Sequence, residues 1–313
     1  MLKLKLFGPG QAEYLYQTLG GFPNQQCHYL LCYLAINRNQ AHARERLAMS
    51  LWEEHQTNNP RKQLRNALWR LRQALLTLGG VSIENYLIIS DESIAFNVGS
   101  SYWLDIENFE KAVEPYLDIP GEVLSAEQIL QLEQALELYT GDLLEGVYED
   151  WCLYEREWLR KLYFAGLVKL LDYFGSQNNY ERAIIFGKKI LDYDPVQERI
   201  HRRVMWLYWQ MGDRNAARIQ YQRCVQILRD ELDVPPMPET EQLYQRLLSN
   251  GHHQNYQRNA SILRKSSQPS LDQYLVKHIW QQLQQLKSTV DEANQEIHRL
   301  EALFQQILPY DER

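Results

Sequence analysis

The sequence predicts a mainly α-helical chain, and three patterns along its 313 residues support that fold class. Residues 1–100 mix short β-rich runs with helical patterns, whereas residues 101–250 are helical in pattern almost throughout. Residues 271–308 show the apolar spacing of one long helix. Residues 251–270, which precede them, hold few large apolar side chains. We therefore expect two folded domains, then a flexible linker, and finally a C-terminal helix.

The composition is that of a soluble cytoplasmic protein, with 45% hydrophobic and 23% charged residues. No run approaches the roughly 18 consecutive apolar residues of a membrane span. The N-terminal MLKLKLFGPG predicts a first β-strand rather than a secretion signal. The four cysteines form no CxxC pair, so we expect reduced thiols rather than a disulfide framework, and no metal site.

Charge is distributed unevenly along the chain. Residues 1–100 hold 10 Lys and Arg against 7 Asp and Glu, a net charge of +3. Since the whole chain carries −7, the remainder carries −10. A negative net charge for the whole chain would argue against a nucleic-acid partner. A basic N-terminal domain followed by an acidic remainder is nevertheless compatible with such a partner.

Four elements are expected within residues 1–100 after the first strand. The apolar run Cys27–Ile36 predicts a buried helix, Ala43–Trp52 a second short helix, and Pro60–Leu78 a longer third helix. Residues 82–98 predict a β-hairpin around the polar turn Asp91-Glu92-Ser93. This order is that of a winged helix-turn-helix, in which the third helix enters the major groove and the hairpin is the wing.

The sequence predicts where the third helix starts, where it ends and which of its sides is buried. Asn59 can cap its free amides, Pro60 suits the first helical position, and Gly79-Gly80 ends it. Leucines at spacings of 4, 3 and 4 predict one buried stripe, formed by Leu64, Leu68, Leu71 and Leu75. The other side is predicted to bind DNA through Lys62, Arg65, Asn66, Trp69, Arg70 and Arg72.

The chemistry of this predicted face suits DNA. Residues 60–75 hold five basic residues and no acid, and Arg can pair with the O6 and N7 edge of guanine. Asn66 carries the donor and acceptor that the edge of adenine requires. The alternative is a solvated basic helix face, with Trp69 packed on a neighbouring domain. The acidic tip Asp91-Glu92 would repel phosphate if the wing approached the backbone.

These segments resemble a known family. LFGPG, CHYLLCYLAINRNQAHARERLAMSLW and LRNALWRLRQAL are similar to the winged helix of the Streptomyces antibiotic regulatory protein type, which is related to the OmpR-type effector domain. ALELYTGDLL, Trp151 with Glu155-Arg156, and DPVQERIHRRVM resemble the bacterial transcriptional activator domain. The resemblance covers residues 1–250 and implies a transcription activator. Its groove-facing positions map onto the same six residues, although Trp69 replaces a smaller or basic residue.

The region from 101 to 250 shows an internal repeat. Asn179–Pro195 and Asp213–Leu228 place Ala183 and Ala217 34 residues apart, which is the tetratricopeptide period. Helical repeats of this kind build surfaces for protein partners. We therefore expect a tetratricopeptide-like domain that contacts RNA polymerase or a regulatory protein.

The C-terminal segment 271–308 shows an unbroken heptad seam that predicts a coiled coil and a homodimer. With Ala293, the seam consists of Val276, Ile279, Leu283, Leu286, Val290, Ile297, Leu300, Phe304 and Ile307. Glu296 and Glu301 leave the orientation of the two helices open. The alternative is a helix that folds back onto the helical body.

No catalytic motif of the serine-hydrolase, zinc-protease or dinucleotide-binding type is present, so we expect neither enzyme activity nor a cofactor. The sequence predicts a sequence-specific regulator that binds double-stranded DNA as a homodimer. The alternative is a helical-repeat adaptor that binds proteins without DNA. The basic face between Lys62 and Arg72 favours the regulator, because an adaptor has no need of it.

Overall fold

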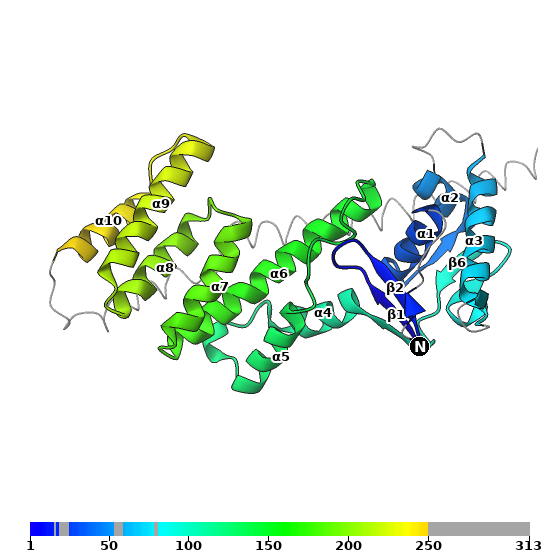
Figure 1. The fold of residues 1–313 in the computed structure, drawn as a ribbon, viewed down its shortest axis with the longest axis horizontal. Coiled ribbons are helices and arrows are strands. Elements are labelled where there is room, and N and C mark those ends of the chain that lie inside the picture. The colour runs from blue at the N-terminus through cyan, green and yellow to red at the C-terminus, as the bar shows by residue number, and fades with distance from the viewer. Residues whose placement is uncertain (16, 19–24, 53–58, 78–80, 250–313) are drawn as a thin grey trace, which may run out of the picture. The chain divides into compact units, whose positions relative to one another are not determined.

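The computed structural model describes residues 1–15, 17–18, 25–52, 59–77 and 81–249 (Figure 1). Residues 1–248 form one compact unit, and they are mainly helical, as the sequence predicts. The predicted linker 251–270 and the predicted seam 271–308 lie outside the described residues. Within the described ranges, none of the helices combines the length and the apolarity that a membrane crossing requires.

A four-stranded sheet begins the chain. Strand β1 (Leu2–Lys5) lies between β2 (Gln11–Tyr14), with which it pairs antiparallel, and β7 (Tyr102–Leu104), with which it pairs parallel. Strand β3 (Gln17–Thr18) completes the sheet beside β2. The predicted first strand is confirmed, and its alternation turns the leucines inward and leaves the lysines half-buried.

Three helices follow the first sheet, close to their predicted bounds. Helix α1 spans Gln25–Ile36, α2 spans Arg44–Trp52 and α3 spans Pro60–Thr77. The described apolar side chains of α1 are largely buried, which agrees with a helix too apolar for a surface position. Helix α3 contacts both α1 and α2 (Figure 1).

A second, three-stranded sheet follows α3. Strand β6 (Ser93–Phe96) lies between β4 (Ala41–Ala43) and β5 (Leu87–Ile89). The hairpin β5–β6 is therefore present, but its first strand is shorter than predicted. A 3-10 turn at Ile83–Asn85 replaces the start of the first predicted run. The chain closes the base of the hairpin through the Asn97 amide, which donates to the Tyr86 carbonyl at 2.8 Å.

Most of the remaining described residues lie in helices, which succeed one another from α4 to α10 (Figure 1). Consecutive helices from α6 to α9 contact each other as neighbours. Ala183 and Ala217 are both completely buried, and Gly187 lets α7 approach α8 closely. A Cβ at Gly187 would lie 2.6 Å from Val204 Cγ2. The helices are α4 (Asp105–Val113), α5 (Ala126–Leu136), α6 (Asp150–Ser176), α7 (Tyr180–Tyr193), α8 (Glu198–Gln210), α9 (Arg214–Leu232) and α10 (Pro238–Leu248).

One hydrophobic core runs through both the N-terminal elements and the first helices of the C-terminal part. Phe7, just after β1, packs against Phe109 of α4 and Tyr139, with ring centroids 5.2 and 4.8 Å apart. Tyr33 of α1 meets Trp151 of α6 at 5.4 Å. Buried Asp105 accepts a hydrogen bond from the Phe7 amide at 2.9 Å, while burial raises the pKa of this carboxyl.

The segment Thr140–Val147, called the joint loop below, ties the helical part to the first sheet by backbone hydrogen bonds. The Gly8 amide donates to the Asp142 carbonyl at 2.8 Å, and the Leu144 amide donates to the Leu6 carbonyl at 2.9 Å. The Glu145 amide donates to the Gly8 carbonyl at 2.7 Å. The joint loop thus continues the backbone pairing of β1 for a few residues.

Candidate nucleic-acid interface

Helix α3 is amphipathic, and its apolar side is fixed against the core. All four predicted leucines are buried, together with Ala67. The Asn59 side chain accepts a hydrogen bond from the Lys62 amide at 3.0 Å, so the predicted cap at the start of the helix is confirmed. On the buried side the Cys27 thiol of α1 lies 3.5 Å from the Ala67 carbonyl. These contacts set which face of α3 points outward.

The outward face of α3 carries the residues predicted to bind DNA. Lys62, Arg65, Asn66 and Trp69 are exposed, and Arg70 is half-buried. Lys62 lies three and four residues before Arg65 and Asn66, and these lie four and three residues before Trp69, so the exposed positions line one side of the helix. Burial raises the pKa of the Cys27 thiol, and the nearby Arg70 charge opposes that rise.

Two basic side chains at the margins of α3 are ion-paired within the protein. Arg72 donates to Glu84 at 2.8 Å, and Arg61 pairs with Glu45 of α2. Hydrogen bonds from Ser82 and Arg72 lower the pKa of Glu84 to about 2. Arg72 therefore lies at the flank, whereas Lys62, Arg65 and Arg70 form no ion pair with another described residue.

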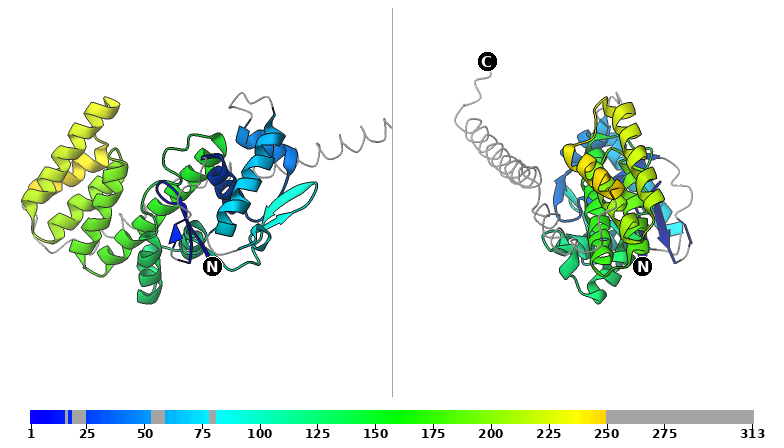
Figure 2. Two further views of the ribbon diagram at one scale, coloured as in Figure 1. Left: turned by 45° about the vertical axis from the view of Figure 1, so that its right-hand side comes forward. Right: turned by 90° about the vertical axis from the view of Figure 1, so that its left-hand side faces the viewer.

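The hairpin β5–β6 extends outward beyond the three helices, as the cyan ribbon in Figure 2 shows. Its acidic turn is tied to the start of α2. The Arg44 guanidinium donates to the Ser90 carbonyl at 2.7 Å, and the Arg44 amide donates to the Glu92 carbonyl at 3.0 Å. A cation thus lies beside the turn that carries Asp91 and Glu92, which offsets part of the repulsion expected there.

The prediction missed two residues near this face. Gln73 is exposed one turn beyond Trp69 on the same side of α3, and a step of four residues along the predicted helix would have found it. Arg44 was not singled out because its partner, the hairpin turn, is 46 residues away in sequence. No local pattern signals that contact.

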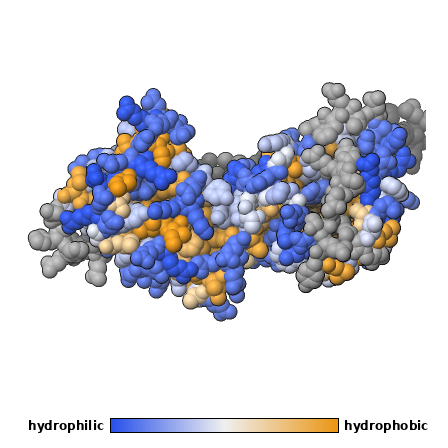
Figure 3. Space-filling view, viewed as in Figure 1, coloured by the Kyte–Doolittle hydropathy of each residue, from blue (hydrophilic) through white to orange (hydrophobic). Residues whose placement is uncertain are grey.

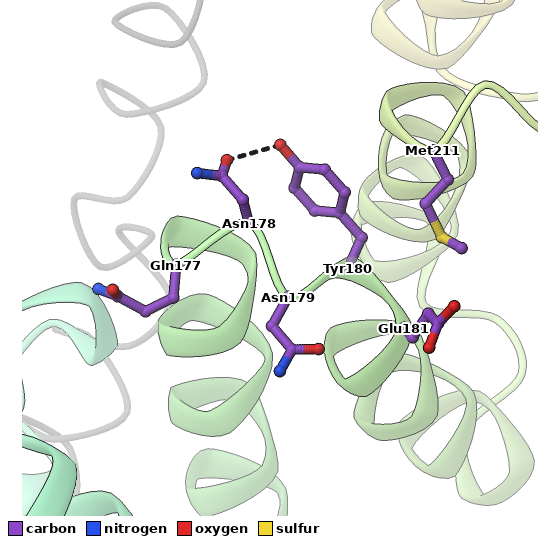
Figure 4. Close-up of a pocket in the computed structure, with 6 residues that line it drawn as sticks. All are labelled: Gln177, Asn178, Asn179, Tyr180, Glu181 and Met211. Atoms are coloured by element: carbon purple, nitrogen blue, oxygen red, sulfur yellow. Dashed lines mark hydrogen bonds between the residues drawn. The ribbon is translucent and has the colours of Figure 1, made fainter.

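The described residues offer little that suggests a small-molecule site. A surface pocket of about 400 Å³ lies where α6 meets α7, and it is lined by Gln177, Asn178, Asn179, Tyr180, Glu181 and Met211 (Figure 4). There the Tyr180 hydroxyl donates to Asn178 Oδ1 at 2.6 Å. A second pocket of about 410 Å³ lies along α9, beside Tyr221 and Val225. Within the described ranges, His, Cys, Asp and Glu side chains form no cluster suited to a metal ion.

Comparison with known proteins finds a matching domain family and two similar regulatory proteins. Residues 104–248 match the bacterial transcriptional activator domain. The chain is 24% identical over 237 residues to the transcriptional regulatory protein MoaR1 of Mycobacterium tuberculosis, covering 73% of each chain. It is 25% identical over 251 residues to the regulatory protein AfsR of Streptomyces coelicolor, covering 79% of this chain but 24% of AfsR. Both relatives are regulatory proteins by name.

A solved structure shares the fold. The chain of Mycobacterium tuberculosis EmbR, in complex with a low-affinity phosphopeptide, aligns with a TM-score of 0.57 at 19% identity. The alignment covers 79% of this chain and 65% of the EmbR chain. The likeness supports the mainly helical architecture described above.

Proposed function

We propose, from the premise that this chain is a transcriptional regulator of the Streptomyces antibiotic regulatory protein type, that it binds duplex DNA through α3 and regulates transcription as an activator. In this proposal α1, α2, α3 and the β5–β6 hairpin act as a winged helix-turn-helix in the cytoplasm. Helix α3 enters the major groove. The hairpin is the wing.

The observation that carries this proposal is the outward face of α3. Lys62, Arg65 and Arg70 are free of ion pairs with described residues, so no internal salt bridge must break when they meet phosphate. The opposite face of α3 is buried and holds the helix rigidly. A rigid helix can position Arg65, Arg70 and Asn66 for base edges as well as phosphates.

The helical part supports the second half of the proposal, contact with RNA polymerase or a regulatory protein. Its consecutive helices and its buried alanines 34 residues apart fit a tetratricopeptide-like repeat. Helix α7 exposes Ile185 and Tyr193, and apolar residues gather around this helix on the face seen in Figure 3. Exposed apolar groups with a polar rim suit a protein partner.

Selection from a pool of random-sequence duplexes with the full-length protein tests DNA binding directly. We expect one enriched sequence, because the cations position the helix and the arginines and Asn66 discriminate bases. A protein-binding adaptor would retain no duplex at moderate salt. A pool without enrichment would therefore contradict the proposal.

The C-terminal segment is proposed to make the protein a homodimer that meets two half-sites. An apolar seam of this length is expected to pair two chains. Sedimentation should find the full chain dimeric and a chain ending at Gly251 monomeric at the same concentration. The shorter chain retains the whole compact unit 1–248, so the two differ mainly in the predicted linker and helix. Equal dimerisation of the two chains would contradict this assignment.

A further inference from the structure

Trp69 has an unusual position for a large aromatic side chain. It is 59% exposed in the middle of α3, between Asn66 and Arg70 on the outward face. It is not among the side chains that pack on either hydrophobic core of the described residues. The sequence-based alternative, that Trp69 packs on a neighbouring domain, therefore finds no support within the described part of the chain. The indole lies where the proposed function requires contact with DNA.

We propose that Trp69 recognises thymine, by packing its indole on a thymine C5-methyl group in the major groove. This inference rests on the proposed function and adds a base preference to it. The thymine methyl is the largest apolar group that base edges present in the major groove, where most other groups are hydrogen-bond donors and acceptors. The indole has a large apolar surface and one N–H donor, so a methyl is its best match.

The neighbours of Trp69 place its ring against base edges. Arg65 lies four residues before it, Arg70 follows it, and Lys62 lies two turns earlier on the same face. When these cations bind phosphates and guanine edges on either side, the indole is carried into the groove and loses its water. Burial of the indole and one methyl group is then favourable, whereas a site without the methyl leaves a gap.

Uracil substitution isolates this contact, because uracil differs from thymine in lacking only the C5-methyl. The probe is the duplex enriched from the random pool, with each thymine replaced in turn by uracil. For the wild-type protein we expect a loss of affinity of about fourfold to tenfold at one or two positions, the scale of one buried methyl group or slightly more. Trp69→Ala should bind the thymine duplex more weakly and should not distinguish it from the uracil duplex.

Two variants serve as controls. Trp69→Leu keeps an apolar side chain and should retain part of the thymine preference. Leu130→Ala removes an exposed apolar side chain from α5, far along the chain from α3, and should keep the full preference. Thermal unfolding of each variant checks folding, and exposed Trp69 should be replaceable without loss of stability.

The outcomes separate this inference from the proposed function. If no uracil substitution weakens wild-type binding, or if Trp69→Ala shows the same uracil effect as the wild type, Trp69 does not read thymine. Enrichment of a sequence whose binding needs Arg65 and Arg70 would still support the proposed function in that case. A pool without any enrichment contradicts both.

Discussion

Replacing Arg156 by alanine should destabilise the protein by about 3–5 kcal/mol, because three buried carbonyls lose their shared donor. Arg156 lies on α6 and is 8% exposed. Its Nε donates to the Leu143 carbonyl at 2.8 Å, and one Nη donates to the carbonyls of Leu144 and Val147 at 2.8 and 2.7 Å. All three carbonyls belong to the joint loop. The loop has left-handed backbone at Leu144 and Gly146 and depends on these bonds to keep its path.

Urea unfolding, followed by circular dichroism, measures this loss. Arg160 provides a matched control, since it lies one turn further along α6 and pairs with Asp142 of the same loop. Arg160 is partly exposed, so Arg160→Ala should cost about 1 kcal/mol or less. Arg156→Lys should fall between the wild type and Arg156→Ala, because an ammonium cannot reproduce the forked geometry. Equal stability of Arg156→Ala and Arg160→Ala would contradict this role.

The second large effect concerns DNA affinity. The double variant Arg65→Ala/Arg70→Ala should bind the enriched duplex at least about 30-fold more weakly than the wild type, because each arginine contributes roughly 1–3 kcal/mol at its site. Neither guanidinium is ion-paired to another described residue, so its removal leaves none of the described acids without a partner that it had before. Direct titration of labelled duplex measures the loss.

A charge-matched variant tests whether DNA affinity depends on the position of the two arginines or only on the net charge of the protein. Lys161→Ala/Lys188→Ala removes two exposed cations from α6 and α7, and thus the same net charge. It should bind the enriched duplex like the wild type within about twofold. A loss equal to that of the arginine variant would mean that net charge, rather than the face of α3, governs binding.

Local signals predicted helix α3 well. Asn59 and Pro60 define its start through the cap and the fixed proline backbone, and the leucine spacing defines its buried side. The outward face follows from that side by the helical period alone. This is why the exposed residues of the candidate interface could be found from sequence.

Local sequence patterns could not predict contacts between segments that lie far apart in the chain. The parallel pairing of β1 with β7 and the bond from Phe7 to Asp105 join residues about 100 positions apart. The ion pair that draws Arg72 to the flank depends on the 3-10 turn at Ile83–Asn85, which replaced an expected strand. Periodicity describes one element at a time and does not specify which elements meet.

The central claim is that the outward face of α3 meets the DNA backbone and bases. The salt dependence of binding to a random-sequence duplex tests it most directly, because each phosphate contact adds about 0.9 to the slope of log affinity against log salt. We predict that Arg65→Ala/Arg70→Ala reduces the steepness of that slope by roughly 2, while Lys161→Ala/Lys188→Ala leaves it unchanged. A slope that is the same for the wild type and the arginine variant would contradict the claim.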